Sequence, residues 1–151
     1  MEPWIYPVVL FPVFFVGLWS GVTWLMSRLS GWASLADSYL AGSTQAELTI
    51  TGSALLNHLG FPVSYSGVLY VGVGAQGVEL SLWRIFALGS PPLMIPWSHL
   101  AECRSYQQLG MFDRFVFRPA LGDVKITLTG RAARLLRDEA ARRGLGAAAA
   151  A

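Results

Sequence analysis

The sequence predicts one N-terminal transmembrane helix followed by a small α+β domain, in which a seven-stranded split barrel is closed by a C-terminal helix. Three observations predict this. Residues 3–27 carry no charged side chain, β-branched and aromatic residues alternate over residues 47–129, and residues 130–143 have one apolar helical face. The expected units are a transmembrane anchor (1–28), a juxtamembrane helix and connector (29–46), a barrel domain (47–144) and a low-complexity tail (145–151).

The N-terminal run, residues 4–26, is expected to be a membrane anchor. A helix over this run rises about 1.5 Å per residue and so exceeds the roughly 30 Å thickness of a hydrocarbon core. Its Val, Ile, Leu and Phe residues together favour insertion by about 4 to 7 kcal/mol. A cleaved signal peptide is the alternative, but it has a basic n-region, a shorter apolar stretch and a small-residue cleavage site. None of these is evident, so we expect a retained single-pass anchor.

Charged and aromatic residues at the two ends of the anchor predict how it sits in the membrane. Arg28 follows the run and no Lys or Arg precedes it, so the positive-inside rule places the amino terminus outside and the domain in the cytoplasm. Amphipathic rings favour the two headgroup zones. The residues expected at the membrane interface are Trp4, Tyr6, Trp24, Arg28 and Trp32.

Small residues on the anchor predict a face for helix packing. Gly17 and Gly21 form a G-x-x-x-G pair with Ser20 beside them, a pattern that lets the backbone of another helix approach closely. Such pairs also arise by chance in membrane helices. The alternative is therefore a strip of small residues that faces lipid.

Residues 30–41 are predicted to form a short amphipathic helix between anchor and domain. Apolar residues recur there at helical spacing, with Ser30 as the expected cap and Gly42 as the stop. The apolar stripe has two placements: along the membrane interface, because Trp32 follows closely on the anchor, or over the core of the domain. We favour the second placement.

Period-two alternation, interrupted by Gly, Pro, Ser and Asp, predicts the sheet. The clearest strand is residues 124–129, where apolar and polar side chains alternate. The helix after it, residues 130–143, groups Ala and Leu on one face and charged residues on the other, and Gly144 is expected to end it. The seven expected strands are residues 47–53, 67–73, 78–82, 93–96, 100–106, 114–118 and 123–129.

Seven strands closed by one C-terminal amphipathic helix resemble the pleckstrin-homology-like (PH-like) barrel, in which the helix plugs one end of two nearly orthogonal sheets. The strings SGWASLA (30–36) and PPLMIPWS (91–98) look like those of uncharacterised bacterial proteins with a single N-terminal membrane helix. The resemblance implies a small cytoplasmic module at the inner membrane of a bacterium, and it implies no ligand site. A lipocalin-like sheet or another split barrel is the structural alternative.

Motifs for common chemistries are weak in this chain. Residues 72–77, GVGAQG, match the dinucleotide-binding G-x-G-x-x-G, but a strand follows where a phosphate-binding loop needs a helix. We interpret these glycines as positive-φ positions of a hairpin. His58 and His99 lack metal-ligand spacing, and no carboxylate pair suggests acid–base catalysis. We therefore expect no catalytic residue, no cofactor, no metal and no small-molecule substrate.

Two segments are candidates for contact with a partner or with lipid. Residues 82–88 are apolar almost throughout, so Trp83, Arg84 and Phe86 are either buried in the domain or face the membrane interface or a partner. The C-terminal helix carries the excess positive charge, and Arg131 and Arg134 are its candidates, although i,i+4 ion pairs favour a solvated face. Its basic residues lack interleaved aromatics, which argues against nucleic acid.

These features favour a non-enzymatic, membrane-anchored interaction module that serves as an accessory or stabilising subunit of a larger integral-membrane protein complex. The alternative is a domain that senses anionic lipid at the membrane surface. An enzyme with an unrecognised site would require an enclosed polar pocket around His58 or His99.

Overall fold

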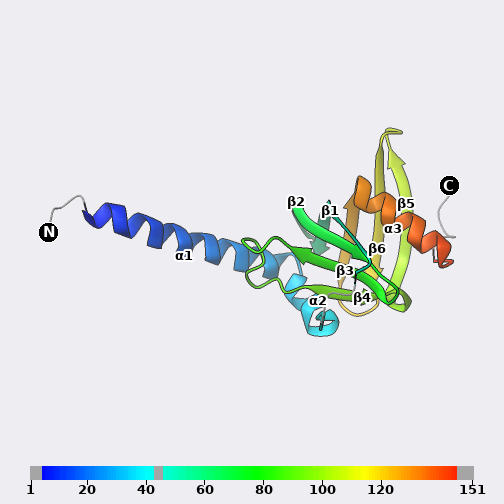
Figure 1. Ribbon diagram of the computed structural model, residues 1–151, viewed down its shortest axis with the longest axis horizontal. Helices are drawn as coiled ribbons and strands as arrows, with labels where there is room; N and C mark the ends of the chain where they lie inside the picture. The colour runs from blue at the N-terminus through cyan, green and yellow to red at the C-terminus, as the bar shows by residue number, and fades with distance from the viewer. Residues whose placement is uncertain (1–4, 43–45, 146–151) are drawn as a thin grey trace.

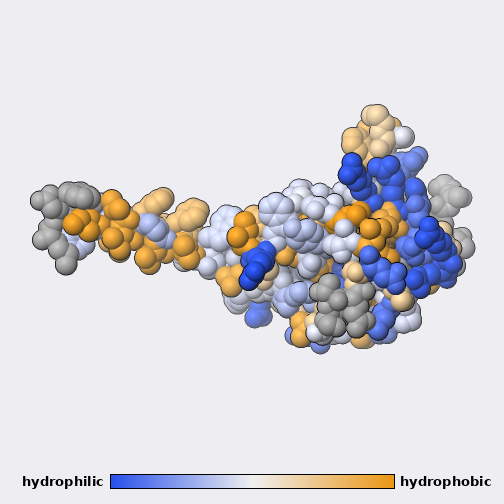
Figure 2. Space-filling view, viewed as in Figure 1, coloured by the Kyte–Doolittle hydropathy of each residue, from blue (hydrophilic) through white to orange (hydrophobic). Residues whose placement is uncertain are grey.

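The first helix, α1 (Ile5–Leu29), projects as a rod from the rest of the molecule (Figure 1). The computed structural model describes residues 5–42 and 46–145, so Trp4 lies outside the described residues. Almost none of α1 is buried, and Figure 2 shows apolar side chains along its projecting part. The helix is long and apolar enough to span a membrane, as the sequence predicts.

The second helix, α2 (Trp32–Tyr39), covers the sheet domain rather than lying free beside α1. Trp32, Leu35 and Tyr39 are buried and belong to the hydrophobic core, which confirms the favoured placement of the apolar stripe. Gly31 precedes the helix as its N-cap with a φ of 78°. The predicted cap, Ser30, contributes instead through its Oγ, which accepts a hydrogen bond of 3.3 Å from the Trp32 amide.

All seven strands join one antiparallel sheet, whose spatial order is β4-β3-β2-β1-β7-β6-β5. The edge strands β4 and β5 do not pair with each other, so the sheet is a curled half-barrel that stays open on one side. The strands are β1 (Leu48–His58), β2 (Phe61–Val73), β3 (Gly77–Leu82), β4 (Leu93–Pro96), β5 (Leu100–Gln108), β6 (Phe112–Pro119) and β7 (Val124–Thr129).

The first two strands are much longer than the sequence predicts. Residues 54–58 and 61–66 belong to β1 and β2, and the expectation that no strand covers them is wrong. A register shift lies between Gly52 and Ser53. The shift passes over Gly67 and Val68 of β2, so the inward positions keep their alternation on both sides of it. The strands continue through Ser and Gly residues that are typical of turns, which is why the sequence suggests that they are shorter. Beyond the bulge β1 pairs with β7 as well as with β2, and the hairpin therefore links the two halves of the sheet.

The third helix, α3 (Arg131–Arg142), packs its apolar face on the sheet at the end of the domain away from α1 (Figure 1). Gly144 has a φ of 73°, and the Leu145 amide donates a 2.8 Å hydrogen bond to the Ala140 carbonyl. This is the expected glycine stop. The buried side chains of α3 are those the sequence places on its apolar face: Ala132, Ala133, Leu136 and Ala140.

The glycines of residues 72–77 lie at a hairpin, as predicted, but the reason given for them is wrong. β2 and β3 continue on either side of the turn, and neither Gly72 nor Gly77 has a positive φ. Close approach explains them instead. A Cβ on Gly77 would overlap the backbone carbonyl of Ile95 in β4, and one on Gly72 would lie 2.5 Å from the Ala46 Cβ.

Gly77→Ala is therefore expected to destabilise the domain by about 1 to 3 kcal/mol, because the added methyl forces β3 and β4 apart. Equilibrium unfolding of the detergent-solubilised chain, followed by circular dichroism, measures the loss. Gly42→Ala is the control, since among the described residues no atom lies within 4 Å of its added Cβ. Equal stability of the two variants would contradict close packing at Gly77.

Candidate functional site

The junction between α1 and the sheet domain is the most distinctive site in the structure. The loop between β3 and β4 lies against the C-terminal part of α1 (Figure 1). The Trp19 Nε1 donates a hydrogen bond of 3.1 Å to the Ile85 carbonyl, and the Trp19 and Phe86 rings lie 5.2 Å apart. The Ser27 Oγ donates to the Gly89 carbonyl. These contacts fix the loop to the helix.

The end of the same loop is held by the second helix and the segment after it. The Trp32 Nε1 donates a 2.8 Å hydrogen bond to the Pro91 carbonyl, and the Ala41 amide donates a 3.0 Å hydrogen bond to the Pro92 carbonyl. Gly89 has a φ of 75°, and a Cβ there would lie 3.2 Å from the Trp24 Cδ1. The close approach to α1 thus depends on glycine at this position.

Residues 83–88 of this loop, called the apolar loop below, expose large apolar side chains. Trp83, Ile85 and Leu88 are 41%, 62% and 50% exposed, while Phe86 is half-buried against Trp19. Arg84 is exposed among them. The sequence leaves burial and surface exposure open for this stretch, and the structure places it on the surface beside α1.

An apolar groove of about 330 Å³ lies next to the apolar loop. It is open to one side and runs between α1 and β2. Its lining side chains are Thr23, Met26, Ser64, Tyr65, Ser66, Val68 and Phe86.

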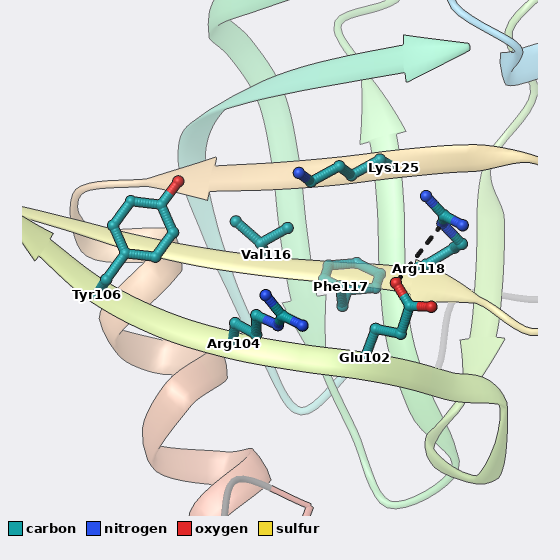
Figure 3. A pocket seen from close by; sticks show the side chains of 7 residues that line it. All are labelled: Glu102, Arg104, Tyr106, Val116, Phe117, Arg118 and Lys125. Carbon is teal, nitrogen blue, oxygen red and sulfur yellow. Dashed lines mark ion pairs between the residues drawn. The ribbon is translucent and has the colours of Figure 1, made fainter. Parts of the chain in front are cut away.

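A cationic groove that the sequence reasoning missed lies on the outer face of the sheet (Figure 3). Arg104, Arg118 and Lys125 project from β5, β6 and β7 into an open space of about 210 Å³. One acid is present, with Glu102 Oε2 3.9 Å from the Arg118 Nε. The signal in the sequence is the outward position of these residues on adjacent strands, which becomes visible only when strand order is known.

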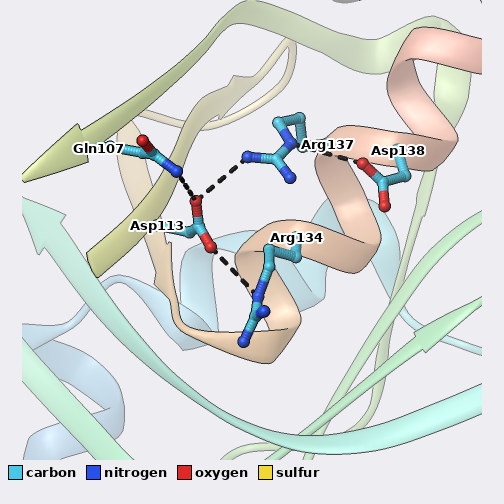
Figure 4. Close-up of polar contacts among 5 residues, drawn as sticks. All are labelled: Gln107, Asp113, Arg134, Arg137 and Asp138. Carbon is cyan, nitrogen blue, oxygen red and sulfur yellow. Dashed lines mark hydrogen bonds and ion pairs between the residues drawn. The ribbon is translucent and has the colours of Figure 1, made fainter. Parts of the chain in front are cut away.

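Asp113 ties α3 to the sheet (Figure 4). Its carboxylate oxygens lie 3.1 Å from both the Arg134 Nε and the Arg137 Nη1, and they accept a 3.0 Å hydrogen bond from the Gln107 Nε2. The Gln107 hydrogen bond and the charges of Arg137 and Arg134 lower the pKa of Asp113. Arg134, a predicted partner or lipid contact, is therefore engaged within the domain.

This cluster predicts how stability depends on pH. The pKa of Asp113 is lower in the folded state than in the unfolded chain. The stabilisation of the folded state by Asp113 is therefore complete when the pH is above the ordinary carboxyl pKa. It is lost as pH falls below about 4, through the folded-state pKa. Asp113→Asn should lower the unfolding midpoint at neutral pH and reduce this acid dependence. Asp138→Asn, at a more exposed carboxylate, is the control, and matching pH profiles for the two variants would contradict the role of Asp113.

The remaining predicted site residues divide between α1 and the domain. Tyr6 and Trp24 are exposed on α1, and the Arg28 guanidinium lies 5.0 Å from the centre of the Trp24 ring. The prediction that Trp32 lies at the membrane interface is wrong. Trp32 is fully buried against Tyr65 and does not face a headgroup zone, because α2 turns inward at Gly31.

The histidines bind neighbouring groups within the fold. The His58 Nδ1 lies 2.9 Å from the Asp123 carbonyl, and the His99 Nδ1 lies 3.2 Å from the Tyr39 Oη. An open groove of about 360 Å³ passes His99, and the described residues that line it include no acid. Within residues 5–42 and 46–145, no three His, Cys, Asp or Glu side chains are grouped to hold a metal.

The packing face on α1 is open. A Cβ added at Gly17 or Gly21 would meet no atom within 4 Å, and Ser20 is only partly covered. Arg131 is likewise exposed, at the start of α3.

Comparison with known proteins finds no matching family model, no matching curated protein and no matching solved structure.

Proposed function

We propose that this chain is a non-enzymatic, single-pass module of a bacterial inner membrane and an accessory subunit of a larger integral-membrane complex. Its amino terminus lies outside and its PH-like domain lies in the cytoplasm. The observation that carries the proposal is the junction, where Trp19 and Ser27 of α1 bind the loop between β3 and β4. A helix joined to its domain in this way holds the domain at a defined orientation to the membrane.

The membrane-embedded contact is expected at Gly17 and Gly21. Both are exposed on α1, and among the described residues no atom lies within 4 Å of a Cβ added at either. In lipid, helices associate through close van der Waals contact, which small residues permit. The occupant we propose is a transmembrane helix of the partner complex.

A second contact surface lies at the tip of the β5–β6 hairpin. Leu109 and Met111 are 82% and 76% exposed, and Phe112 beside them is also exposed. Figure 1 shows this hairpin reaching beyond the rest of the sheet, and Figure 2 shows its apolar tip above hydrophilic neighbours. Apolar side chains gathered at a protruding tip favour contact with another protein.

The alternative is a domain that recognises anionic lipid through Arg84 and the arginines of α3, and the part of it that rests on α3 has less support. Arg134 and Arg137 pair with Asp113, and Arg142 and Arg143 lie 2.8 Å and 3.7 Å from Glu139 carboxylate oxygens. These ion pairs reduce the free positive charge of α3. The helix also lies at the end of the domain away from α1 (Figure 1).

Co-purification from native membranes in mild detergent tests the proposal. The Gly17→Leu/Gly21→Leu variant should lose the membrane partner that travels with the wild-type chain, because the larger side chains keep the helices apart. Val9→Leu/Val13→Leu is the control, since it enlarges exposed residues at the same spacing and should retain the partner. Recovery of the lone polypeptide from the wild type, or equal recovery of a partner with both variants, would contradict the proposal.

A further inference from the structure

We propose that the apolar loop, residues 83–88, is a second membrane element that inserts into the cytoplasmic leaflet beside α1. The inference rests on α1 spanning the membrane, as proposed above, but not on the identity of any partner. Four features of the structure carry it: the free length of α1, the depth of the loop contacts, the hydrogen bonds of the loop backbone and the character of its exposed side chains.

The free part of α1 is too short to cross a bilayer alone. The contact of Trp19 with Ile85 marks where the loop begins to accompany the helix. Residues 5–18, before that contact, extend about 21 Å at about 1.5 Å per residue. A hydrocarbon core is about 30 Å thick. To span it, α1 must place Trp19 and the following turns within the membrane, and the loop bound to them enters with them.

The depth of the loop follows from its register along α1. Arg28 is the first charged residue after the apolar run and is expected near the headgroups. Trp19 lies nine positions earlier, about 13 Å along the helix axis. Ser27, which binds Gly89, lies next to Arg28. The loop therefore runs from the headgroup level at Gly89 to the hydrocarbon at Ile85.

Part of the loop backbone is hydrogen-bonded within the protein, as an apolar environment requires. Backbone groups without hydrogen bonds are costly in hydrocarbon, so an irregular segment there must satisfy them within the protein. The Phe86 amide donates to Trp83 at 2.8 Å, and the Ser90 amide donates to Ala87 at 2.9 Å. Within the turn, hydrogen bonds are accepted by the carbonyls of Trp83, Arg84 and Ala87. Side chains of α1 donate hydrogen bonds to the carbonyls of Ile85 and Gly89.

The exposed side chains match the same environment. Trp83, Ile85 and Leu88 expose large apolar surfaces that water does not favour and that acyl chains do. Arg84 is the one charge of the loop, and its long side chain reaches back to phosphate groups while its methylenes stay in lipid. The apolar groove beside Phe86 then opens toward acyl chains rather than water.

Site-directed spin labelling of the full chain in phosphatidylcholine–phosphatidylglycerol vesicles tests this inference. The background is Cys103→Ser, which removes the single cysteine. Ile85→Cys and Leu88→Cys report on the loop, Val13→Cys on the anchor and Met111→Cys on the hairpin tip. At each label, collision rates with oxygen, which concentrates in lipid, are compared with those of a water-soluble nickel chelate.

The labels at positions 85 and 88 are expected to show oxygen-to-nickel ratios several-fold above that at position 111, and close to that at position 13. Low ratios at positions 85 and 88 with a high ratio at 13 would overturn loop insertion and leave the anchor intact. A low ratio at 13 as well would overturn the anchor and the inference together. A circular dichroism spectrum that matches that of the Cys103→Ser chain confirms that each variant folds. Because positions 85 and 88 are labelled separately, each gives an independent measurement of loop insertion.

Discussion

Trp32→Ala should be among the most destabilising substitutions in this chain, with a loss of about 3 to 5 kcal/mol in the free energy of unfolding. Trp32 is fully buried, its ring packs edge-on against Tyr65 at 5.8 Å, and its Nε1 donates to the Pro91 carbonyl. The truncation leaves a cavity under α2 and removes one of the bonds that hold the loop between β3 and β4.

Denaturant unfolding of the detergent-solubilised chain measures this effect, with Trp83→Ala as the matched control. Trp83 has the same side chain but is 41% exposed, so its loss should cost much less. Comparing Trp32→Ala with Trp83→Ala also distinguishes the two placements of Trp32 that the sequence allows, along the membrane interface or over the core of the domain. Similar stability losses for both variants would indicate that Trp32 is no more buried than Trp83 and would contradict the core position of α2.

Gly31→Ala is expected to have the second large effect, because two costs add at one position. Gly31 has a φ of 78°, which an alanine adopts at a cost of about 1 to 2 kcal/mol. An added Cβ would also lie 2.5 Å from the Val124 Cγ2 and 2.7 Å from the His58 Cγ. Such overpacking costs about 1 to 3 kcal/mol more. Gly31 joins α1 to α2, so the strain falls on the junction.

Gly60→Ala separates these two costs. Gly60 has a φ of 86°, yet no atom lies within 4 Å of an added Cβ, so only the backbone cost applies there. The unfolding free energy of Gly31→Ala should therefore fall below that of Gly60→Ala by the overpacking cost. If Gly31→Ala were as stable as Gly60→Ala, the close packing of Gly31 against Val124 and His58 would be wrong.

Elements whose pattern is local could be predicted from the sequence. α1 is a continuous apolar run, α3 has one apolar face ended by Gly144, and β7 alternates along its length. Each pattern depends only on neighbouring residues and on one buried face. These are the features that a single sequence carries without knowledge of the tertiary structure.

Features that depend on distant contacts were missed or misread. The extension of β1 past Ser53 depends on a bulge and on pairing with β7, and the need for Gly77 depends on the approach of β4. These contacts join residues that are far apart in the sequence, so neighbouring residues alone do not specify them.

In the candidate site, too, the features with a local sequence pattern could be predicted and those that depend on distant contacts could not. The apolar loop stands out in the sequence because residues 82–88 lack polar alternation, a pattern that indicates either burial or an apolar surface. Its attachment to Trp19 and Ser27 involves residues more than sixty positions earlier and required the structure. The cationic groove was missed because Arg104 and Lys125 become neighbours only through the order of β5, β6 and β7.

The contacts of Trp19 and Ser27 with the loop between β3 and β4 lead us to propose that α1 and the sheet domain form one rigid unit, so that the membrane fixes the orientation of the domain. The most direct test is the distance between spin labels at Val13→Cys on α1 and Arg131→Cys on α3, in the Cys103→Ser chain reconstituted in vesicles. Both positions are exposed, so the labels should leave the packing intact. We predict one narrow distance distribution, and a broad distribution would show that the helix and the domain move independently and would contradict the claim.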